Sequence, residues 1–206
     1  MTGSAAITGV GCITGFGAGV EQTWQNLLKG ASAVRERPRR GLDGTRCFHT
    51  TESPDTTCLE QMIPGLRYPR PARTTLLARV ASREAWKMAN LDAGPNADRL
   101  GLVISRNFGQ QQVVDRYYET LWDKGPTAVS GLLFVQSIAN AVLGRIALDF
   151  GLRGPSILNF GSPALGLALD LIRDDRADAI LVGCLDELSD YALTLCNCRG
   201  LTPLST

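Results

Sequence analysis

The chain has 206 residues, of which 44% are hydrophobic and 20% are charged, and its formal net charge is +1. These values exclude a strongly basic, nucleic-acid-binding protein and predict a single globular domain over residues 1–206 with one sizeable core. No apolar run reaches the roughly 20 residues that span a bilayer, and the first residues lack a charged signal region. We therefore expect a cytoplasmic protein without a membrane partner.

The N-terminal part of the chain combines a β-branched run with glycines. The run SAAITGVGCIT (4–14) predicts a strand, and Val20, Trp24, Leu27 and Leu28 follow at helical spacing. The intervening glycines are spaced two, four and two residues apart, which does not match the G-x-G-x-x-G of a dinucleotide loop. The segment therefore predicts a strand, a glycine loop and a helix, and no cofactor.

The next segment is poor in periodic pattern. From Ala33 to Pro71 the chain is rich in Pro, Gly, Arg and Thr, which predicts a surface excursion, variable over about residues 35–72, with at most short elements. Its basic cluster RERPRRG (35–41) favours a solvated loop over an anion or partner patch.

The remainder of the chain alternates helical and strand patterns. We predict helices within 73–91, 107–125, 137–152 and 163–175, and strands within 99–105, 156–160 and 177–187. This alternation predicts an α/β fold with a mostly parallel sheet and helices on both faces. In such sheets the chemistry gathers where strands end, which directs attention to the loops after Ser105, Phe160 and Gly183.

The cysteines do not form a recognisable metal motif. All six are expected to be reduced thiols, because no secretion signal precedes them. The CNC run at 196–198 has no C-x-x-C companion, and His49 is the sole histidine, so no zinc site is predicted.

The stretch NFGSPALGL has the layout of an active-site turn. A strand ending at Phe160 delivers the chain to a helix N-terminus, where free N–H groups stabilise negative charge and enzymes often place a nucleophile. Ser162 is the only hydroxyl at this turn. An N-cap at Ser162, with Pro163 as the first helical residue, is a sufficient explanation for it.

Four segments, in chain order, carry a family resemblance. They are ITGVGCITGFGAGVEQTWQNLLKGASAV, GLVISRNFGQ, SGLLFVQSIANAVLGRIALDFGLRGPS and ADAILVGCLDELSD. Together they resemble the N-terminal half of the β-ketoacyl synthase branch of the thiolase-like enzymes. The resemblance implies a thiolase-like half fold. Complete members work as dimers and condense acyl chains held on cysteine with malonyl units on acyl carrier protein.

The resemblance also shows what this sequence lacks. It implies a cysteine nucleophile near Pro163, yet no cysteine lies between Cys58 and Cys184. The two histidines and the lysine of complete members come from their second half. Ser162 and Cys184 are weak catalytic candidates. Ser162 would need a base for which only His49 is available, and Cys184 is better explained as a small buried residue.

Asp186 and Glu187 are adjacent carboxylates at the end of the last strand. In an extended segment, successive side chains point to different sides, so we do not predict an acid/base pair from their spacing.

We therefore expect a noncatalytic subunit of the chain-length-factor type. It would pair with a full-length β-ketoacyl synthase or with itself, and reach acyl carrier protein through that complex, in polyketide, aryl-polyene or fatty-acid-type biosynthesis. The resemblance places the interface or acyl tunnel at Leu132, Leu133, Phe134, Ser137, Ile138 and Asn159; packing within this chain's own core is the alternative for each. Two other functions stay open: an acyl-transferring or hydrolysing enzyme that uses Ser162 or Cys184, or a truncated ketosynthase remnant.

Overall fold

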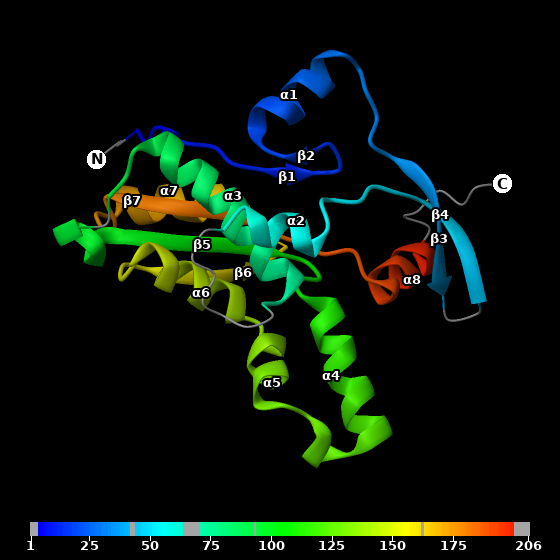
Figure 1. Ribbon diagram of the computed structural model, residues 1–206. Helices are drawn as coiled ribbons and strands as arrows, with labels where there is room; N and C mark the ends of the chain where they lie inside the picture. The colour runs from blue at the N-terminus through cyan, green and yellow to red at the C-terminus, as the bar shows by residue number, and fades with distance from the viewer. Residues whose placement is uncertain (1–3, 42–43, 64–70, 93, 162, 200–206) are drawn as a thin grey trace.

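The computed structural model describes residues 4–41, 44–63, 71–92, 94–161 and 163–199. The elements follow one another as shown in Figure 1. In chain order they are β1 (Ile13–Thr14), β2 (Gly17–Ala18), α1 (Val20–Leu28), β3 (Arg35–Gly41), β4 (Gly44–Thr50), α2 (Thr56–Gln61), α3 (Arg73–Ala89), η1 (Gly94–Arg99), β5 (Leu100–Arg106), α4 (Gln111–Lys124), η2 (Pro126–Ala128), α5 (Gly131–Ser137), α6 (Ala141–Phe150), β6 (Ser156–Phe160), α7 (Ala164–Arg173), β7 (Ala179–Cys184) and α8 (Asp190–Cys198).

A three-stranded parallel sheet forms the centre of the molecule. Its strand order is β6-β5-β7, with Val103 of β5 opposite both Ile157 of β6 and Val182 of β7. The central strand is buried from Leu100 to Ser105. A continuous apolar run of this kind is typical of a strand that is covered on both faces. The predicted parallel sheet and its three strands are confirmed.

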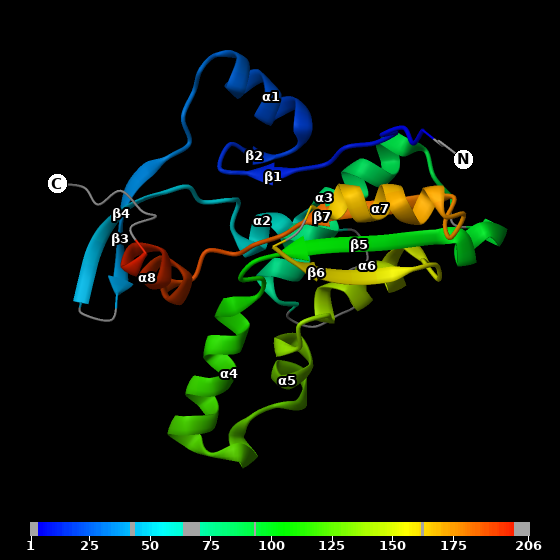
Figure 2. The ribbon, with the colours of Figure 1, turned by 180° about the vertical axis from the view of Figure 1, so that it is seen from behind.

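Helices cover both faces of this sheet. Leu102 and Ile104 point toward α6 and α3, where they pack with Ile146. Val103 points to the opposite face and packs against Ala168 and other residues of α7. Alternate residues of one strand therefore anchor two different layers, as Figures 1 and 2 show. Burial of each large aliphatic side chain contributes about 1.5–3 kcal/mol.

An ion pair joins the two helices on the first face. The Arg79 guanidinium of α3 is buried and donates to the Asp149 carboxylate of α6. Asp149 is also paired with Arg145, one turn earlier on its own helix, at 2.7 Å. Loss of one partner would leave a buried charge, so this triad fixes α3 on α6.

The N-terminal segment differs from the prediction. Only Ile13 and Thr14 form a strand, β1, which pairs with β2 in a short antiparallel hairpin, and residues 4–12 are irregular. These residues run along α3 at very close approach: a Cβ at Gly11 would lie 2.0 Å from the Ala81 carbonyl oxygen. The glycines therefore serve helix packing, and the predicted strand over 4–14 is wrong for most of its length.

The region from Arg35 onward is more regular than predicted. The strands β3 and β4 form an antiparallel hairpin of seven residues each, which lies apart from the central sheet (Figure 1). Phe48 is buried at 2% exposure, and the hairpin contacts α8. A cross-strand ladder and one buried aromatic thus order a segment whose composition predicted an irregular excursion. The basic cluster 35–41 is strand β3 rather than a loop.

The helices α4 and α5 project together from the body of the molecule (Figures 1 and 2). The helix predicted within 137–152 forms as α6 and begins four residues later, because Ile138 is extended, whereas α5 was not predicted. Within the described residues no single helix is long and apolar enough to cross a membrane. The pair α5 and α6 passes that test only jointly, by length and composition, with a bend of 92° between the two helices.

Candidate functional site

The connection from β6 to α7 is the strand-to-helix turn that the sequence singled out. The Gly161 N–H donates to the Arg106 carbonyl at 3.1 Å, which fastens the end of β6 to the end of β5. The helix begins at Ala164 with Pro163 in the N-cap position and no side-chain cap. The prediction that Pro163 is the first helical residue, after a cap at Ser162, is therefore wrong. Ser162 itself lies outside the described residues.

A chain of polar contacts starts beside this turn. The Arg106 guanidinium lies 5.0 Å from the centre of the Phe160 ring and donates to the Gln110 side-chain carbonyl. Gln110, which is 2% exposed, in turn donates to the Ile138 carbonyl. The chain of contacts thus connects the end of β6 with the end of α5. Ile138, whose carbonyl accepts this hydrogen bond, is the C-cap residue of α5.

The Arg106 side chain is held in a partly desolvated position. Burial lowers the pKa of its guanidinium from the ordinary value, and the nearby Asp186 partly opposes that change. Its Nε atom is buried without a hydrogen-bond partner among the described residues. An arginine side chain stays protonated in proteins, so a positive charge remains at the carboxyl end of β5.

The predicted interface residues lie around this chain of contacts. Leu132, Leu133 and Ser137 are half-buried in α5, and Asn159 is half-buried in β6. Phe134 and Ile138 are the outward members, with 51% and 41% of their surface exposed. The Phe134 ring lies 6.0 Å from that of Tyr117 on α4.

We call the surface formed by α5, the aromatic face of α4 and the end of β6 the α5 face. Sequence reasoning missed Tyr117 on this face and the Arg106 and Gln110 side chains beneath it. The adjacent aromatic pair at 117–118 was the only available signal for them.

The two adjacent carboxylates after β7 face different sides, as predicted. The Asp186 carboxylate accepts hydrogen bonds from the backbone N–H groups of Asn107, Phe108 and Gly109 at 2.7–3.0 Å. Glu187 lies on the other side, is 5% exposed, and accepts from the Thr74 hydroxyl. Burial raises the pKa of the Glu187 carboxyl above its usual range. These residues form two separate sites.

The remaining sequence candidates do not assemble a catalytic group. Cys184 is exposed at the end of β7, so the prediction of a small buried residue is wrong; among the described residues β7 pairs only with β5 and is an edge strand. His49 is exposed on β4, opposite Glu36. Cys196 and Cys198 lie two residues apart on α8, where side chains point in different directions. Among the described residues no group of three or more His, Cys, Asp or Glu side chains could hold a metal.

A parallel sheet with helices on both faces, and a strand that delivers the chain to the N-terminus of α7, define a ketosynthase-type, thiolase-like fold. The family model of the β-ketoacyl synthase N-terminal domain matches residues 4–200. The chain therefore belongs to the β-ketoacyl synthase family, and the resemblance seen in the sequence is confirmed.

The curated relatives match this chain over part of their own length. The chain is 31% identical over 183 residues to 3-oxoacyl-[acyl-carrier-protein] synthase 2 of Staphylococcus aureus, which covers 86% of this chain and 45% of that protein. It is 29% identical to the protein of the same name from Synechocystis, again over 183 residues, covering 44% of that protein. The chain thus spans about half the length of the curated relatives it matches.

Solved structures support the same fold. The ishigamide ketosynthase/chain length factor superposes with a TM-score of 0.77 at 24% identity and covers 94% of this chain and 50% of that one. The complex AntDE:AntF, a type II acyl-carrier protein with its ketosynthase bound to the hexaketide, gives a TM-score of 0.69 at 19% identity. It covers 94% of this chain and 48% of that one.

Proposed function

We propose that this chain is a noncatalytic, chain-length-factor-type subunit that pairs with an active β-ketoacyl synthase. The observation that carries the proposal is the β6–α7 connection. The strand and the helix N-terminus that position a family nucleophile are both present, but the chain has no cysteine between Cys58 and Cys184. A fold that keeps the scaffold and lacks the thiol is suited to shaping a partner's site rather than to forming an acyl-enzyme.

The α5 face supports the pairing part of the proposal. Phe134 and Ile138 are large, apolar and exposed, and the Tyr117 ring lies 6.0 Å from the Phe134 ring. Exposed aromatic side chains on a projecting element are typical anchors of protein interfaces. The edge strand β6 contains no Lys, Arg or Pro, the residues that usually discourage an edge strand from pairing with another chain. A partner that covers this region would therefore also cover an open sheet edge.

The wider setting follows from the relatives and is part of the proposal. The solved ketosynthase with the highest TM-score reported above is described with its chain length factor, and another is bound to its acyl-carrier protein. We place this chain in the cytoplasm, in polyketide, aryl-polyene or fatty-acid-type biosynthesis. It would meet acyl carrier protein through its ketosynthase partner.

Co-expression tests the pairing. The wild-type chain, expressed with a full-length ketosynthase from the same pathway, should elute from size-exclusion chromatography as a complex. Phe134→Asp places a charge in the α5 face and should abolish that complex, because a desolvated charge without a partner is costly. Leu148→Asp is the matched control, since Leu148 is an exposed aliphatic residue on α6. A wild-type monomer beside its co-expressed ketosynthase would refute the pairing.

Intact-mass measurement tests the noncatalytic assignment. The purified chain, incubated with acyl- and malonyl-carrier proteins, should gain no acyl group and yield no condensed product. Acylation at Cys184, which is exposed, would instead favour an acyl-transferring enzyme. Cys184→Ala should then remove the label, and this result would overturn the noncatalytic assignment.

A further inference from the structure

A trench of about 1480 Å³ lies beside β7, on the sheet edge opposite β6. Ala81 and Ala85 of α3 line it on one side, and Leu165 and Leu169 of α7 line it on the other. These two helices cover opposite faces of the sheet, so the trench continues the sheet layer beyond β7. Leu165 is 62% exposed, so the apolar wall is open.

The free edge of β7 forms the floor of the trench. All of its residues, 179–184, line the trench, and among the described residues this strand pairs only with β5. The N–H and C=O groups on the outer side of β7 therefore have no ladder partner. The strand sequence AILVGC contains no charged residue or Pro, the features that usually protect an edge strand. Residues 179–183 are half-buried, whereas β5 is buried from Leu100 to Ser105.

The N-terminal segment borders the trench on the other side and runs above the β7 edge in Figures 1 and 2. It is fixed to α3, because Gly9 and Gly11 pack against the helix backbone. The Cys12 N–H also donates to the Glu84 carboxylate of α3 at 3.0 Å. Within the described part of the chain, the backbone groups of residues 5–9 form no hydrogen bond. Two rows of unpaired backbone groups, one on an edge strand and one on a β-prone run, thus border the trench.

We propose that an extended, apolar segment of another polypeptide chain enters the trench as an added β-strand. It pairs with β7 on one side and faces residues 5–9 on the other, since a strand presents N–H and C=O groups along both of its edges. A hydrocarbon chain would contact the apolar walls but leave the β7 groups unpaired. A second copy of this chain cannot donate its own β7, because its α3 and α7 would collide with those of the first copy. The proposal does not depend on pairing at the α5 face.

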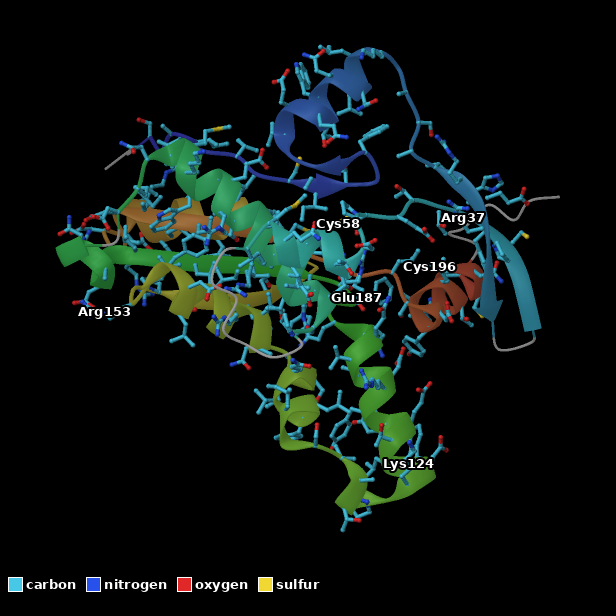
Figure 3. All side chains as sticks on the ribbon, viewed as in Figure 1. Arg37, Cys58, Lys124, Arg153, Glu187 and Cys196 are labelled. Carbon is cyan, nitrogen blue, oxygen red and sulfur yellow. The ribbon has the colours of Figure 1, made fainter. Side chains whose placement is uncertain are left out.

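The two borders of the trench run in the same direction. Gly9 and then Gly11 approach successively earlier turns of α3, so the N-terminal segment runs toward the start of that helix. Thr74, in the first turn of α3, donates its hydroxyl to Glu187, which follows β7. Glu187 lies beside the start of α3 (Figure 3). β7 therefore ends where the N-terminal segment also arrives, and an added strand is either parallel or antiparallel to both.

The charges at this end indicate the direction of the added strand. Glu52, Asp55 and Asp186 line the trench there together with the buried Glu187, against the guanidinium of Arg73. This excess of negative charge favours a segment that carries a positive group at that end. Antiparallel pairing, which is slightly more stable than parallel pairing, puts the N-terminal end of the segment there. The structure thus favours an antiparallel strand with a basic N-terminal end.

A test strand fused to the full chain measures whether the trench accepts it. The peptide Lys-Val-Thr-Val-Thr-Val is joined after Thr206 through a Gly/Ser linker of about 30 residues, which gives an effective concentration of about 1 mM. We expect hydrogen exchange at the outward amides of β7 to slow about tenfold, the change that a Kd of about 0.1 mM produces at that concentration. The matched control has Pro in place of both Thr residues of the peptide. It should give no protection, because Pro removes two N–H donors and prevents strand pairing.

A substitution in the trench wall tests the location. Leu169→Asp places a charge on the α7 side and should remove the protection. Leu148→Asp is the control, because Leu148 is an exposed leucine on α6 outside the trench lining. Circular dichroism establishes that each variant folds. If Leu169→Asp does not fold, the comparison of the Thr and Pro fusions decides.

Three results would overturn the proposal. Equal exchange in the Thr and Pro fusions would show that β7 does not pair with an added strand. Stronger protection by the reversed peptide, Val-Thr-Val-Thr-Val-Lys, would refute the antiparallel direction. Protection of β7 in the unfused chain that rises with its concentration would show that a second copy covers this edge.

Discussion

Removal of the Asp186 carboxylate should loosen the loop between β5 and α4. This carboxylate, in the β7–α8 loop, accepts the backbone N–H groups of Asn107, Phe108 and Gly109 at 3.0, 2.7 and 2.7 Å. It also accepts from the Asn107 side chain at 3.0 Å. One side chain therefore satisfies three consecutive donors of the loop that leads to Gln110 and the α5 face.

The size of the effect follows from these contacts. Hydrogen bonds to a charged group contribute about 1.5–3 kcal/mol each when well shielded, and less when water can replace the lost partner. Asp186 and Asn107 are exposed, whereas Gly109 is buried. We therefore count one bond fully and discount the others, which gives about 2–4 kcal/mol for Asp186→Ala. A typical domain is stable by about 5–15 kcal/mol, so the loss should be large.

Urea denaturation at fixed pH measures this loss, since a lower midpoint with an unchanged slope reports stability alone. Hydrogen exchange at the Phe108 and Gly109 amides should accelerate in the same variant. Asp186→Asn keeps one acceptor oxygen and should lose less than Asp186→Ala. Glu119→Ala removes an exposed acid on α4 and is the control. Equal midpoints for Asp186→Ala and the control would show that the loop does not depend on this carboxylate.

Three further predictions concern stability. Burial raises the pKa of Glu187, so the folded chain binds this proton more tightly than the unfolded chain and loses stability as pH rises from the ordinary value of 4.5 through the raised pKa. Glu187→Gln should therefore gain stability relative to wild type across that window in a pH series of urea titrations, and a pH-independent difference would contradict this. Ile146→Ala should cost about 2–5 kcal/mol by leaving a cavity at a side chain 1% exposed, measured by thermal unfolding; a cost below that of a surface substitution would refute its place in the core. Ser189→Ala should cost about 0.5–2 kcal/mol because the Ser189 hydroxyl caps α8 at the Ala192 N–H, and unchanged far-ultraviolet dichroism and midpoint would contradict the cap.

The sheet could be predicted from the sequence because its strands are short apolar runs between helical patterns. LGLVIS has no polar residue before Ser105 and is buried throughout in the structure. The helix predicted within 73–91 also forms, although Met88, an apolar residue near its end, is exposed. Trp86 and Ala78 pack against the sheet instead. The hydrophobic periodicity thus predicts the helix itself more reliably than it predicts which of its residues face the core.

The elements that the sequence missed depend on contacts between distant segments. β3 contains Pro38 and four arginines, and its order comes from the ladder with β4 and from the buried Phe48. The opposite error arose for residues 4–12, where a β-prone run stays irregular because its glycines pack against α3. Local propensity does not report which distant segment a strand or loop will contact, here β4 for β3 and α3 for residues 4–12.

The sequence predicted where the candidate site lies, but not the contacts within it. The strand-to-helix turn could be located from the pattern around Phe160, and the missing thiol from the sequence itself. The contacts from Phe160 through Arg106 and Gln110 to Ile138 could not be predicted, since they join three loops that only the sheet brings together.

The two edge strands of the sheet, β6 and β7, have different neighbours. On the β6 side, α5 projects from the body of the molecule and carries the exposed apolar residues Phe134 and Ile138, which supports the proposed pairing. β7 borders a concave trench whose lining includes Ala81 and Ala85 of α3 and Leu165 and Leu169 of α7. The central strand β5 pairs with both edges, and its C-terminal loop is held by Asp186 on the β7 side and by the Arg106 contacts on the β6 side. The Asp186 carboxylate of the β7–α8 loop therefore joins the end of β7 to the loop that carries Gln110 to the end of α5, so a change at Asp186 should reach the α5 face through that loop.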